Sequence, residues 1–364
     1  MKHTNIIFMF QTVKNIFLSK EKIKHLMSPD SKEISSENPS SAIPKTNTWA
    51  ESWMASPGPV SFTEHLNLFF KGLGMGTADI VPGVSGGTIA FITGIYHNLL
   101  TAITSVNGKL FRQAFQLRFK EALAELHLRF LLTLVLGIVV ALISTAHLVH
   151  YLLAKHPVPT WSIFFGLITA SIIVVSHSIN NRISSFPALV LGTLLAYGIT
   201  GLIPLHTPEE PWYIFFSGMI AICAMILPGL SGSFILLILG KYVFITSALR
   251  NPFAQDNLEI ILIFIAGCII GILGFSRFLR YGLERWHDFT LALLTGFMIG
   301  AMRKVWPWKI TLESQIIRGK EHVLLEENVW PLVNTELWIS ILLMGVGFAA
   351  VMFLDNISKN RAED

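Results

Sequence analysis

The sequence predicts an all-α polytopic membrane protein built from two inverted-topology repeats. Each repeat is expected to be a broken or re-entrant helical hairpin followed by three transmembrane helices. Apolar residues make up 52% of the 364 residues, charged residues only 14%, and the mean hydropathy is +0.58. Several uninterrupted apolar stretches reach the ~20 residues that a helix needs to cross a bilayer. A third observation is that one segment of 28 residues occurs twice.

The chain begins with a polar stretch that is rich in Lys, Ser, Asn and Pro. It has no apolar run with the length and flanks of a signal peptide. We therefore expect residues 1–60 to form a mobile cytoplasmic N-terminal tail, and residues 356–364 a short cytoplasmic C-terminal tail.

The repeated segment runs from Phe69 to Tyr96 and again from Phe215 to Tyr242. The two copies align without a gap at a spacing of 146 positions, and 13 of the 28 pairs are identical. Each copy has an apolar arm, a P-G-x-S-G break and a second apolar arm. Proline lacks the N–H that a helix needs and glycine adds no packing, so the helix is interrupted there. The pattern predicts a helical hairpin whose second helix opens at Ser85 or Ser231.

Three further apolar segments follow each hairpin. A weaker echo at a spacing of 130 positions, including Gly137/Gly267 and Gly166/Gly296, keeps the same order in both halves. The duplication thus covers whole halves, residues 61–204 and 205–355. The predicted spans are Phe130–Leu153, Trp161–His177, Pro187–Ile203, Ile260–Phe278, Phe289–Met302 and Leu337–Leu354.

The two halves are expected to be antiparallel. Whether the hairpin arms cross or turn back, each half crosses the membrane an odd number of times, so the second half enters from the opposite face. The loop charges give the same orientation, because basic loops fall inside when both termini are cytoplasmic. We therefore expect a multi-pass membrane protein with both termini in the cytoplasm. The inner basic residues include Lys109, Arg129, Arg182, Arg277, Arg280, Arg285, Lys359 and Arg361, and the outer acidic turn contains Glu209 and Glu210.

The repeated break suggests a binding site. Non-helical backbone at membrane depth is tolerated only where protein buries it or water reaches it. Ser85 and Ser231 are natural N-caps, and Gly86 and Gly232 leave room for a ligand near the backbone. Two helix N-termini that converge from opposite faces suit an anion such as phosphate. The alternative is a close helix crossing in which small residues only permit packing.

Three ionisable residues break the symmetry of the repeat, since Lys71, Asp79 and Lys241 align with Ser217, Met225 and Ile95. An ionisable side chain within an apolar segment is a functional candidate by default. The lysines could neutralise an anionic headgroup, and the carboxylate could pair with Lys71 or carry a coupling proton. The structural alternatives are lysines that snorkel to an interface and a carboxylate that bonds across the break.

No grouping of histidines or cysteines in the sequence suits a metal ion. Basic inner loops explain the pI near 9.0 without a nucleic-acid partner.

The candidate site residues fall into two groups, the helix breaks and the substrate-binding residues. The predicted helix breaks are Pro82 and Pro228. The predicted substrate-binding residues are Lys71, Asp79, Gly83, Ser85, Gly86, Thr88, Gly229, Ser231, Gly232, Ser233 and Lys241.

The stretches KGLGMGTADIVPGVSGGTIAFITGIY and ILPGLSGSFILLILGKY resemble the polyprenyl-phosphate transporter family of bacterial and archaeal membrane proteins. The resemblance extends over nearly everything after Phe62. It implies translocation of undecaprenyl phosphate, the lipid carrier of cell-wall precursors, from the outer to the cytoplasmic leaflet for reuse. The resemblance supplies no residue roles; those given above are inferred from the residues themselves.

The predicted anion site and the family resemblance both favour a flippase-like secondary transporter. A phosphate cannot cross hydrocarbon alone, whereas an isoprenoid tail can stay in lipid while the halves rock around the headgroup. No Walker sequence is present, so we expect no ATP drive within this chain. A secondary transporter of this kind is expected to need no cofactor and to have no enzymatic activity, and H⁺ or Na⁺ could be its coupling ion. An inorganic anion channel or exchanger would also use opposed helix N-termini. A more remote alternative is an intramembrane serine protease, but the G-x-S-G motif occurs twice and has no histidine base to pair with it.

Overall fold

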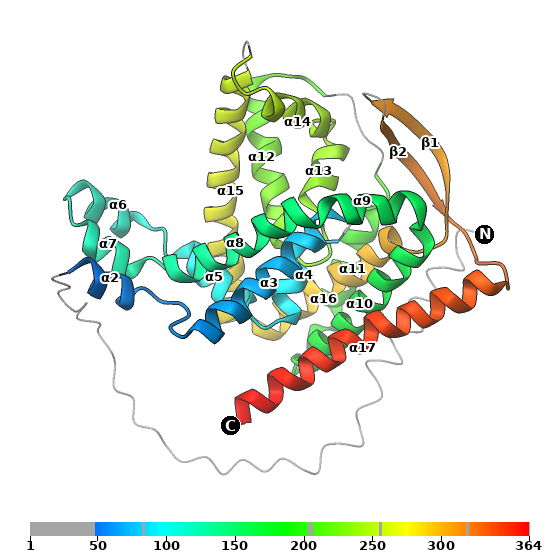
Figure 1. Cartoon of the computed structure of the whole chain (residues 1–364), viewed down its shortest axis with the longest axis horizontal. Coiled ribbons are helices and arrows are strands. Elements are labelled where there is room, and N and C mark those ends of the chain that lie inside the picture. Colours follow the sequence, from blue (N-terminus) through cyan, green and yellow to red (C-terminus); the bar gives the residue numbers. More distant parts are fainter. Residues whose placement is uncertain (1–47, 82–83, 203–206, 255–256, 318–319, 364) are drawn as a thin grey trace. The chain divides into compact units, whose positions relative to one another are not determined.

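The computed structural model describes residues 48–363 except 82–83, 203–206, 255–256 and 318–319. The described residues belong to one compact unit. The regular structure of the described residues is helical apart from one two-stranded sheet between the last two helices (Figure 1).

The first copy of the repeated segment folds as three consecutive helices, α3 (Phe62–Ile80), α4 (Gly86–Ile92) and α5 (Tyr96–Thr104). Helix α3 ends two residues before the proline because a helix cannot continue through a Pro-Gly pair. Helix α4 opens directly after its N-cap Ser85, at the predicted position.

The second copy gives α12 (Pro211–Ile226), α13 (Gly232–Ile238) and α14 (Tyr242–Arg250). The end of α12 and both ends of α13 and α14 lie 146 positions after their counterparts in the first copy. The axes of α13 and α14 meet at 113°. The repeated sequence therefore produces a repeated local structure.

Six longer helices carry the remaining apolar segments. Helix α8 packs on α3, α15 on α12, α16 on α11 and α17 on α10. Among the described helices, four are long and apolar enough to cross a membrane, or up to six if two bent pairs each count as one span. The six helices are α8 (Leu128–Ser144), α10 (Pro157–His177), α11 (Arg182–Ile199), α15 (Asn257–Arg285), α16 (His287–Val305) and α17 (Thr335–Glu363).

Helices α3 and α8 lie side by side and run in the same direction. His65 Nδ1 lies 2.9 Å from Thr133 Oγ1 near their starts, and Thr77 Oγ1 lies 3.4 Å from Thr145 Oγ1 near their ends. The chain between the two helices must therefore return to the end of the pair at which α3 begins.

The second hairpin has the same relationship to its neighbour. Gly218 of α12 lies against Phe264 of α15, and further along both helices Gly271 lies against Met219. Helices α12 and α15 thus run in the same direction, with α13 and α14 returning between them. The close approach at Gly218 depends on the missing side chain, because a Cβ there would lie 2.5 Å from the Phe264 carbonyl oxygen.

The structure differs from the sequence prediction in three segments. The predicted span Phe130–Leu153 is divided at Thr145 into α8 and α9 (Ala146–Lys155). The expected N-terminal tail contains α2 (Trp49–Ala55), which packs on α7 (Phe119–Glu125). At the other end, α17 continues through most of the expected C-terminal tail. A short helix, α6 (Gly108–Phe115), precedes α7.

A β-hairpin lies between the predicted spans Phe289–Met302 and Leu337–Leu354, where the sequence analysis predicted no regular structure. Strand β1 (Lys309–Ile317) pairs antiparallel with β2 (Lys320–Asn328), and Lys309 stands opposite Asn328 in the register. This hairpin connects α16 to α17 (Figure 1).

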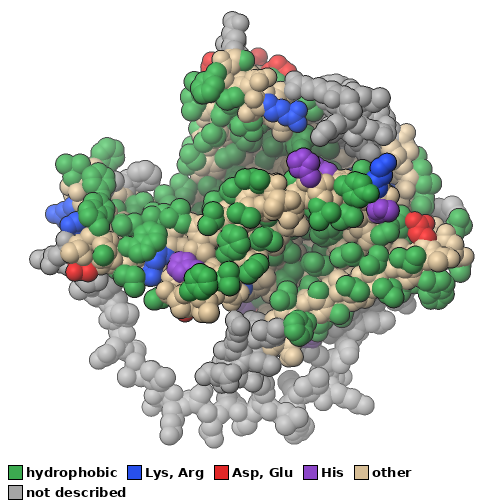
Figure 2. Space-filling view, viewed as in Figure 1, with side chains coloured by type: hydrophobic (Ala, Val, Ile, Leu, Met, Phe, Trp, Pro, Cys, Tyr) green, Lys and Arg blue, Asp and Glu red, His purple; other side chains and the backbone are tan. Residues whose placement is uncertain are grey.

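Much of the protein's apolar surface has no protein neighbour. Only 17% of the apolar window of α15 and of α17 is buried within the protein, and green apolar side chains cover large parts of the face in Figure 2. Water is a poor solvent for a surface of this kind, whereas lipid tails match it. The exposed side chains therefore indicate a multi-pass membrane protein.

Candidate functional site

The two broken hairpins touch one another at their breaks. The Ser85 hydroxyl, which stands just before α4, donates to the backbone carbonyl of Met225 at 2.9 Å. The Tyr96 hydroxyl donates to the carbonyl of Ile226 at 3.1 Å. Both acceptors belong to the last turn of α12, whose carbonyls have no partner within the helix. Hydroxyls of the first half thus satisfy backbone groups that the second half exposes by breaking its helix.

A third bond joins the halves in the opposite sense. The backbone N–H of Gly229, in the second break, donates to the Thr88 hydroxyl at 3.0 Å. Both residues are buried, and Thr88 has no exposed surface. Gly87, beside it, is equally confined, because a Cβ there would lie 2.6 Å from the Ile226 carbonyl oxygen. Polar bonds and close backbone packing therefore form the contact together.

Asp79 occupies the N-terminus of α4. Its carboxylate accepts the Gly86 N–H at 2.7 Å, while the Ser85 hydroxyl accepts the Gly87 N–H at 3.1 Å. The space beside Gly86, predicted to admit a ligand, holds this carboxylate. A ligand can approach the α4 N-terminus only if Asp79 moves.

The second break differs because Met225 stands where the first has Asp79. Ser231 is the N-cap of α13, and its hydroxyl lies 2.9 Å from the Ser233 hydroxyl instead of bonding to the helix backbone. The space beside Gly232 is filled by the Ala221 carbonyl oxygen, 2.7 Å from a Cβ position. A pair of hydroxyls, without a carboxylate, thus stands at the start of α13.

The two predicted lysines lie at the other ends of the short helices. Lys71 Nζ donates to the carbonyl of Thr93, the C-cap of α4, at 2.8 Å. Seven helical residues span ~10 Å, so this ammonium group is about one short helix away from the Ser85 break. A cation at a helix C-terminus is favoured by the helix dipole.

Lys241 is almost fully buried, with 2% of its surface exposed. Its ammonium group donates to the Thr207 carbonyl at 3.1 Å and lies within 5.4 Å of the ring centroids of Tyr213 and Phe244. Thr207 in turn donates its hydroxyl to the carbonyl of Leu239, the C-cap of α13. These contacts give Lys241 a structural role in the observed conformation and do not place it at the breaks.

The predicted site residues therefore separate into a group at the breaks and two lysines at the far ends of α4 and α13. Pro82 and Gly83 lie outside the described residues. Pro228 is buried two residues after the end of α12. The residues placed at or beside the breaks are Asp79, Ser85, Gly86, Thr88, Gly229, Ser231, Gly232 and Ser233.

Sequence reasoning missed Tyr96 and the backbone acceptors at the end of α12. Tyr96 did carry a signal, because it is identical to Tyr242 in the aligned copy. The backbone carbonyls at the end of α12 carried no such signal, since every residue has a carbonyl. The repeated tyrosine hydroxyl was therefore the indication in the sequence that Tyr96 contributes to the contact.

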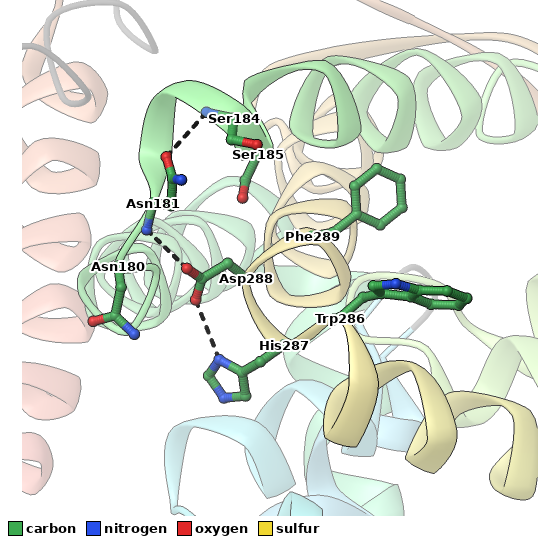
Figure 3. A pocket seen from close by; sticks show the side chains of 8 residues that line it. All are labelled: Asn180, Asn181, Ser184, Ser185, Trp286, His287, Asp288 and Phe289. Carbon is green, nitrogen blue, oxygen red and sulfur yellow. Dashed lines mark hydrogen bonds and ion pairs between the residues drawn. The ribbon is translucent and has the colours of Figure 1, made fainter.

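A separate pocket of about 490 Å³ lies where the α10–α11 turn meets the α15–α16 turn (Figure 3). Asp288 accepts the Asn181 N–H at 2.8 Å across it, and none of the predicted site residues lines it. In the part of the chain that the structure describes, no three His, Cys, Asp or Glu side chains are grouped to hold a metal ion.

The fold and the site define the class of protein: a multi-pass helical membrane protein whose two halves meet through broken helical hairpins. The chain belongs to the undecaprenyl phosphate translocase-like family, whose model matches residues 75–323. The resemblance identified from the repeated motifs is thereby confirmed.

Two relatives show how far the similarity extends. A polyprenyl-phosphate transporter of Vibrio cholerae is 46% identical over 271 residues, which cover 73% of this chain and 86% of the relative. A polyprenyl-phosphate transporter of Staphylococcus aureus is 33% identical over 253 residues, which cover 65% of this chain and 84% of the relative. No solved structure matches the chain.

Proposed function

We propose that this protein is a secondary transporter that flips undecaprenyl phosphate, or a similar polyprenyl phosphate, from the outer to the cytoplasmic leaflet of a bacterial cytoplasmic membrane. The names of the relatives support the substrate class. The physical need is clear, because a phosphate does not cross hydrocarbon unaided while an isoprenoid tail is soluble in it. The protein has only to shelter the headgroup while the tail remains in lipid.

The observation that carries the proposal is the polar contact between the breaks of the two halves. Ser85, Thr88 and Tyr96 of the first half bond to backbone groups of the second half. Unpaired backbone within a membrane needs polar partners or water. A headgroup that entered between the halves would meet these same hydroxyls and N–H groups, so the contact suits a site that opens and closes around a polar ligand.

An inverted arrangement of the halves fits the helix directions. If each hairpin is re-entrant, three spans cross in each half; if both of its arms cross, five do, and either number is odd. Helices α11 and α16 also run in the same direction, with Gly192 against Leu293 and Gly300 against Tyr197. This is the expected direction if α12 to α14 turn back and α15 crosses once. If both termini are cytoplasmic, two inverted halves would open the headgroup site first to one face of the membrane and then to the other.

We propose that the headgroup is held where the two short helices begin. In the observed conformation the Asp79 carboxylate caps α4, whereas the start of α13 has the Ser231 and Ser233 hydroxyls and the Ala221 carbonyl but no carboxylate. The second break is thus the better acceptor for a negative charge, and the first requires Asp79 to move or to take up a proton. A coupling H⁺ or Na⁺ would act at this carboxylate.

The contacts of Ser85 do not favour a role as a hydrolytic nucleophile. Both partners of its hydroxyl are backbone groups, the Met225 carbonyl and the Gly87 N–H. A serine nucleophile needs a general base within hydrogen-bond reach. The contacts support a non-enzymatic role for this serine.

The test is reconstitution in liposomes with labelled undecaprenyl phosphate, followed by its movement between leaflets. We expect rapid exchange with the unaltered protein and a large loss in the double variant Ser85→Ala/Ser231→Ala. Ser144→Ala is the matched control, because the Ser144 hydroxyl is exposed and donates only to the Val140 carbonyl of its own helix. Chloride flux without lipid movement would instead favour an anion channel.

A further inference from the structure

A cluster of charged side chains lies at the base of the β-hairpin. Lys304 Nζ, at the end of α16, lies 2.8 Å from Glu326 Oε2, and Lys309 Nζ lies 3.5 Å from the same oxygen. Lys309 also donates to the Lys304 carbonyl at 2.6 Å. Two elements, α16 and the hairpin, thus bring two ammonium groups to one carboxylate.

This cluster has an excess of positive charge away from bulk water. The side chains of Lys304 and Glu326 are 20% exposed and that of Lys309 only 7%. Burial alone would raise the pKa of Glu326, but the charges of Lys309 and Lys304 and their hydrogen bonds together outweigh it and hold the pKa below its usual value. Among the side chains that the structure describes, the cluster therefore has two cations and one anion. A buried charge without a counter-charge is unfavourable, so the cluster is electrostatically suited to one more anion.

The cluster adjoins the second broken hairpin. Lys304 Nζ lies 5.2 Å from the centroid of the Phe234 ring, and Phe234 follows Ser233 in α13. The ammonium group is therefore next to the helix that carries the Ser231–Ser233 hydroxyl pair. An anion held by Lys304 would stand close to the start of α13.

Aromatic rings border the same cluster. Lys309 Nζ lies 4.1 Å from the centroid of the Trp161 ring. Trp306 packs edge-on against Phe165, Trp308 and Trp330, with ring centroids 5.5–5.9 Å apart. A hydrated inorganic ion gains little from such rings, whereas an apolar chain attached to a phosphate would bury surface against them.

We propose that Lys304 and Lys309, arranged around Glu326, form an anion-binding site that receives the phosphate monoester headgroup of the lipid beside the second broken hairpin. The site rests on the proposed function for the identity of its ligand. The indole rings contact the first isoprenoid units while the lysines bind the phosphate.

Charge substitutions in the full-length protein in nanodiscs test this assignment, with the dissociation constant for labelled undecaprenyl phosphate as the readout. Lys304→Gln leaves the cluster neutral, and we expect roughly tenfold weaker binding, as for the loss of one charged hydrogen bond. Lys304→Gln/Glu326→Gln restores one excess positive charge and is expected to recover most of the affinity. Lys304→Arg keeps the charge and shows that the position tolerates substitution.

Lys155→Gln is the matched control, because it removes the same charge from an exposed lysine at the end of α9 and should leave binding unchanged. Unlabelled inorganic phosphate should compete poorly with the lipid, and the alcohol undecaprenol should not compete. Equal competition by inorganic phosphate would overturn the lipid assignment. A purely structural cluster would lose binding equally in the single and the double variant, and that result would overturn the site.

Transport measured on the same variants separates this inference from the proposed function. Charge-dependent binding by a protein that moves no lipid would leave the site standing and refute the transporter. Unchanged binding and unchanged transport in Lys304→Gln would refute the site and leave the transporter standing.

Discussion

The Thr88 hydroxyl accepts a hydrogen bond from the backbone N–H of Gly229 at 3.0 Å, and this bond joins residues 141 positions apart in the chain. Thr88 lies in the first turn of α4, and Gly229 in the break between α12 and α13. The Gly229 N–H has no partner within a helix because the helix is interrupted at Pro228. The hydroxyl of one repeat therefore replaces the helical partner that the other repeat has lost.

Thr88→Val should remove this bond at nearly constant volume. The Gly229 N–H would then be buried without an acceptor, which costs about 1–3 kcal/mol. We expect a lower thermal midpoint in detergent and slower lipid movement in liposomes. Thr88→Ser keeps the hydroxyl and is the control; a loss in Thr88→Ser but not in Thr88→Val would show that the methyl group, not the bond, is what matters.

Gly229→Ala should be more harmful than Gly94→Ala. Both glycines have positive φ, +88° and +72°, so an alanine is strained at either position, by about 1–2 kcal/mol. A Cβ on Gly94 would meet nothing within 4 Å, whereas one on Gly229 would lie 2.9 Å from Met298 Cα. Thermal midpoints of the two variants measure the difference. A similar decrease in both would mean that the Met298 backbone yields without cost.

The ends of the short helices were predictable because their causes are local. Pro-Gly interrupts a helix wherever it occurs, and a serine next to it is a ready N-cap. Helices α4 and α13 accordingly begin directly after Ser85 and Ser231. The β-hairpin was not predicted, although IIRGKEHVLL has a turn-forming glycine between two short apolar runs.

The partners of the site residues were not predictable, because they depend on how the halves pack. Nothing in the sequence near Ser85 indicates the Met225 carbonyl as its acceptor. Lys71 is likewise in the middle of α3, and only the return of the hairpin brings Thr93 within its reach. The structural alternative for Asp79, a bond across the break, describes its observed contact with Gly86.

Asp79→Asn separates the shape of the Asp79 side chain from its charge. An asparagine oxygen can still accept the Gly86 N–H, so we expect a thermal midpoint close to that of the unaltered protein. Asp79→Ala removes the acceptor and should lower stability by about 0.5–2 kcal/mol, as for a lost helix cap. If Asp79 carries the coupling proton, lipid movement by Asp79→Asn should no longer vary with pH. Transport that keeps the original pH profile would remove Asp79 from any proton-coupled scheme.

Lys309 should make both stability and anion binding depend on pH, in opposite directions. Burial lowers its pKa from 10.5 to about 8, and the Lys304 charge adds to this while Glu326 opposes it. Between these two values the folded protein binds fewer protons than the unfolded chain, so stability rises with pH through that window. The cluster of Lys304, Lys309 and Glu326 meanwhile loses its excess positive charge above about pH 8, so binding of undecaprenyl phosphate should weaken.

Lys309→Arg isolates this effect, because a guanidinium group stays protonated throughout the window. We expect the variant to show a flatter dependence of both the thermal midpoint and the dissociation constant on either side of pH 8. Other groups that titrate nearby would act equally in the two proteins. Identical pH profiles for Lys309→Arg and the unaltered protein would therefore show that Lys309 keeps its proton in the folded state throughout the window.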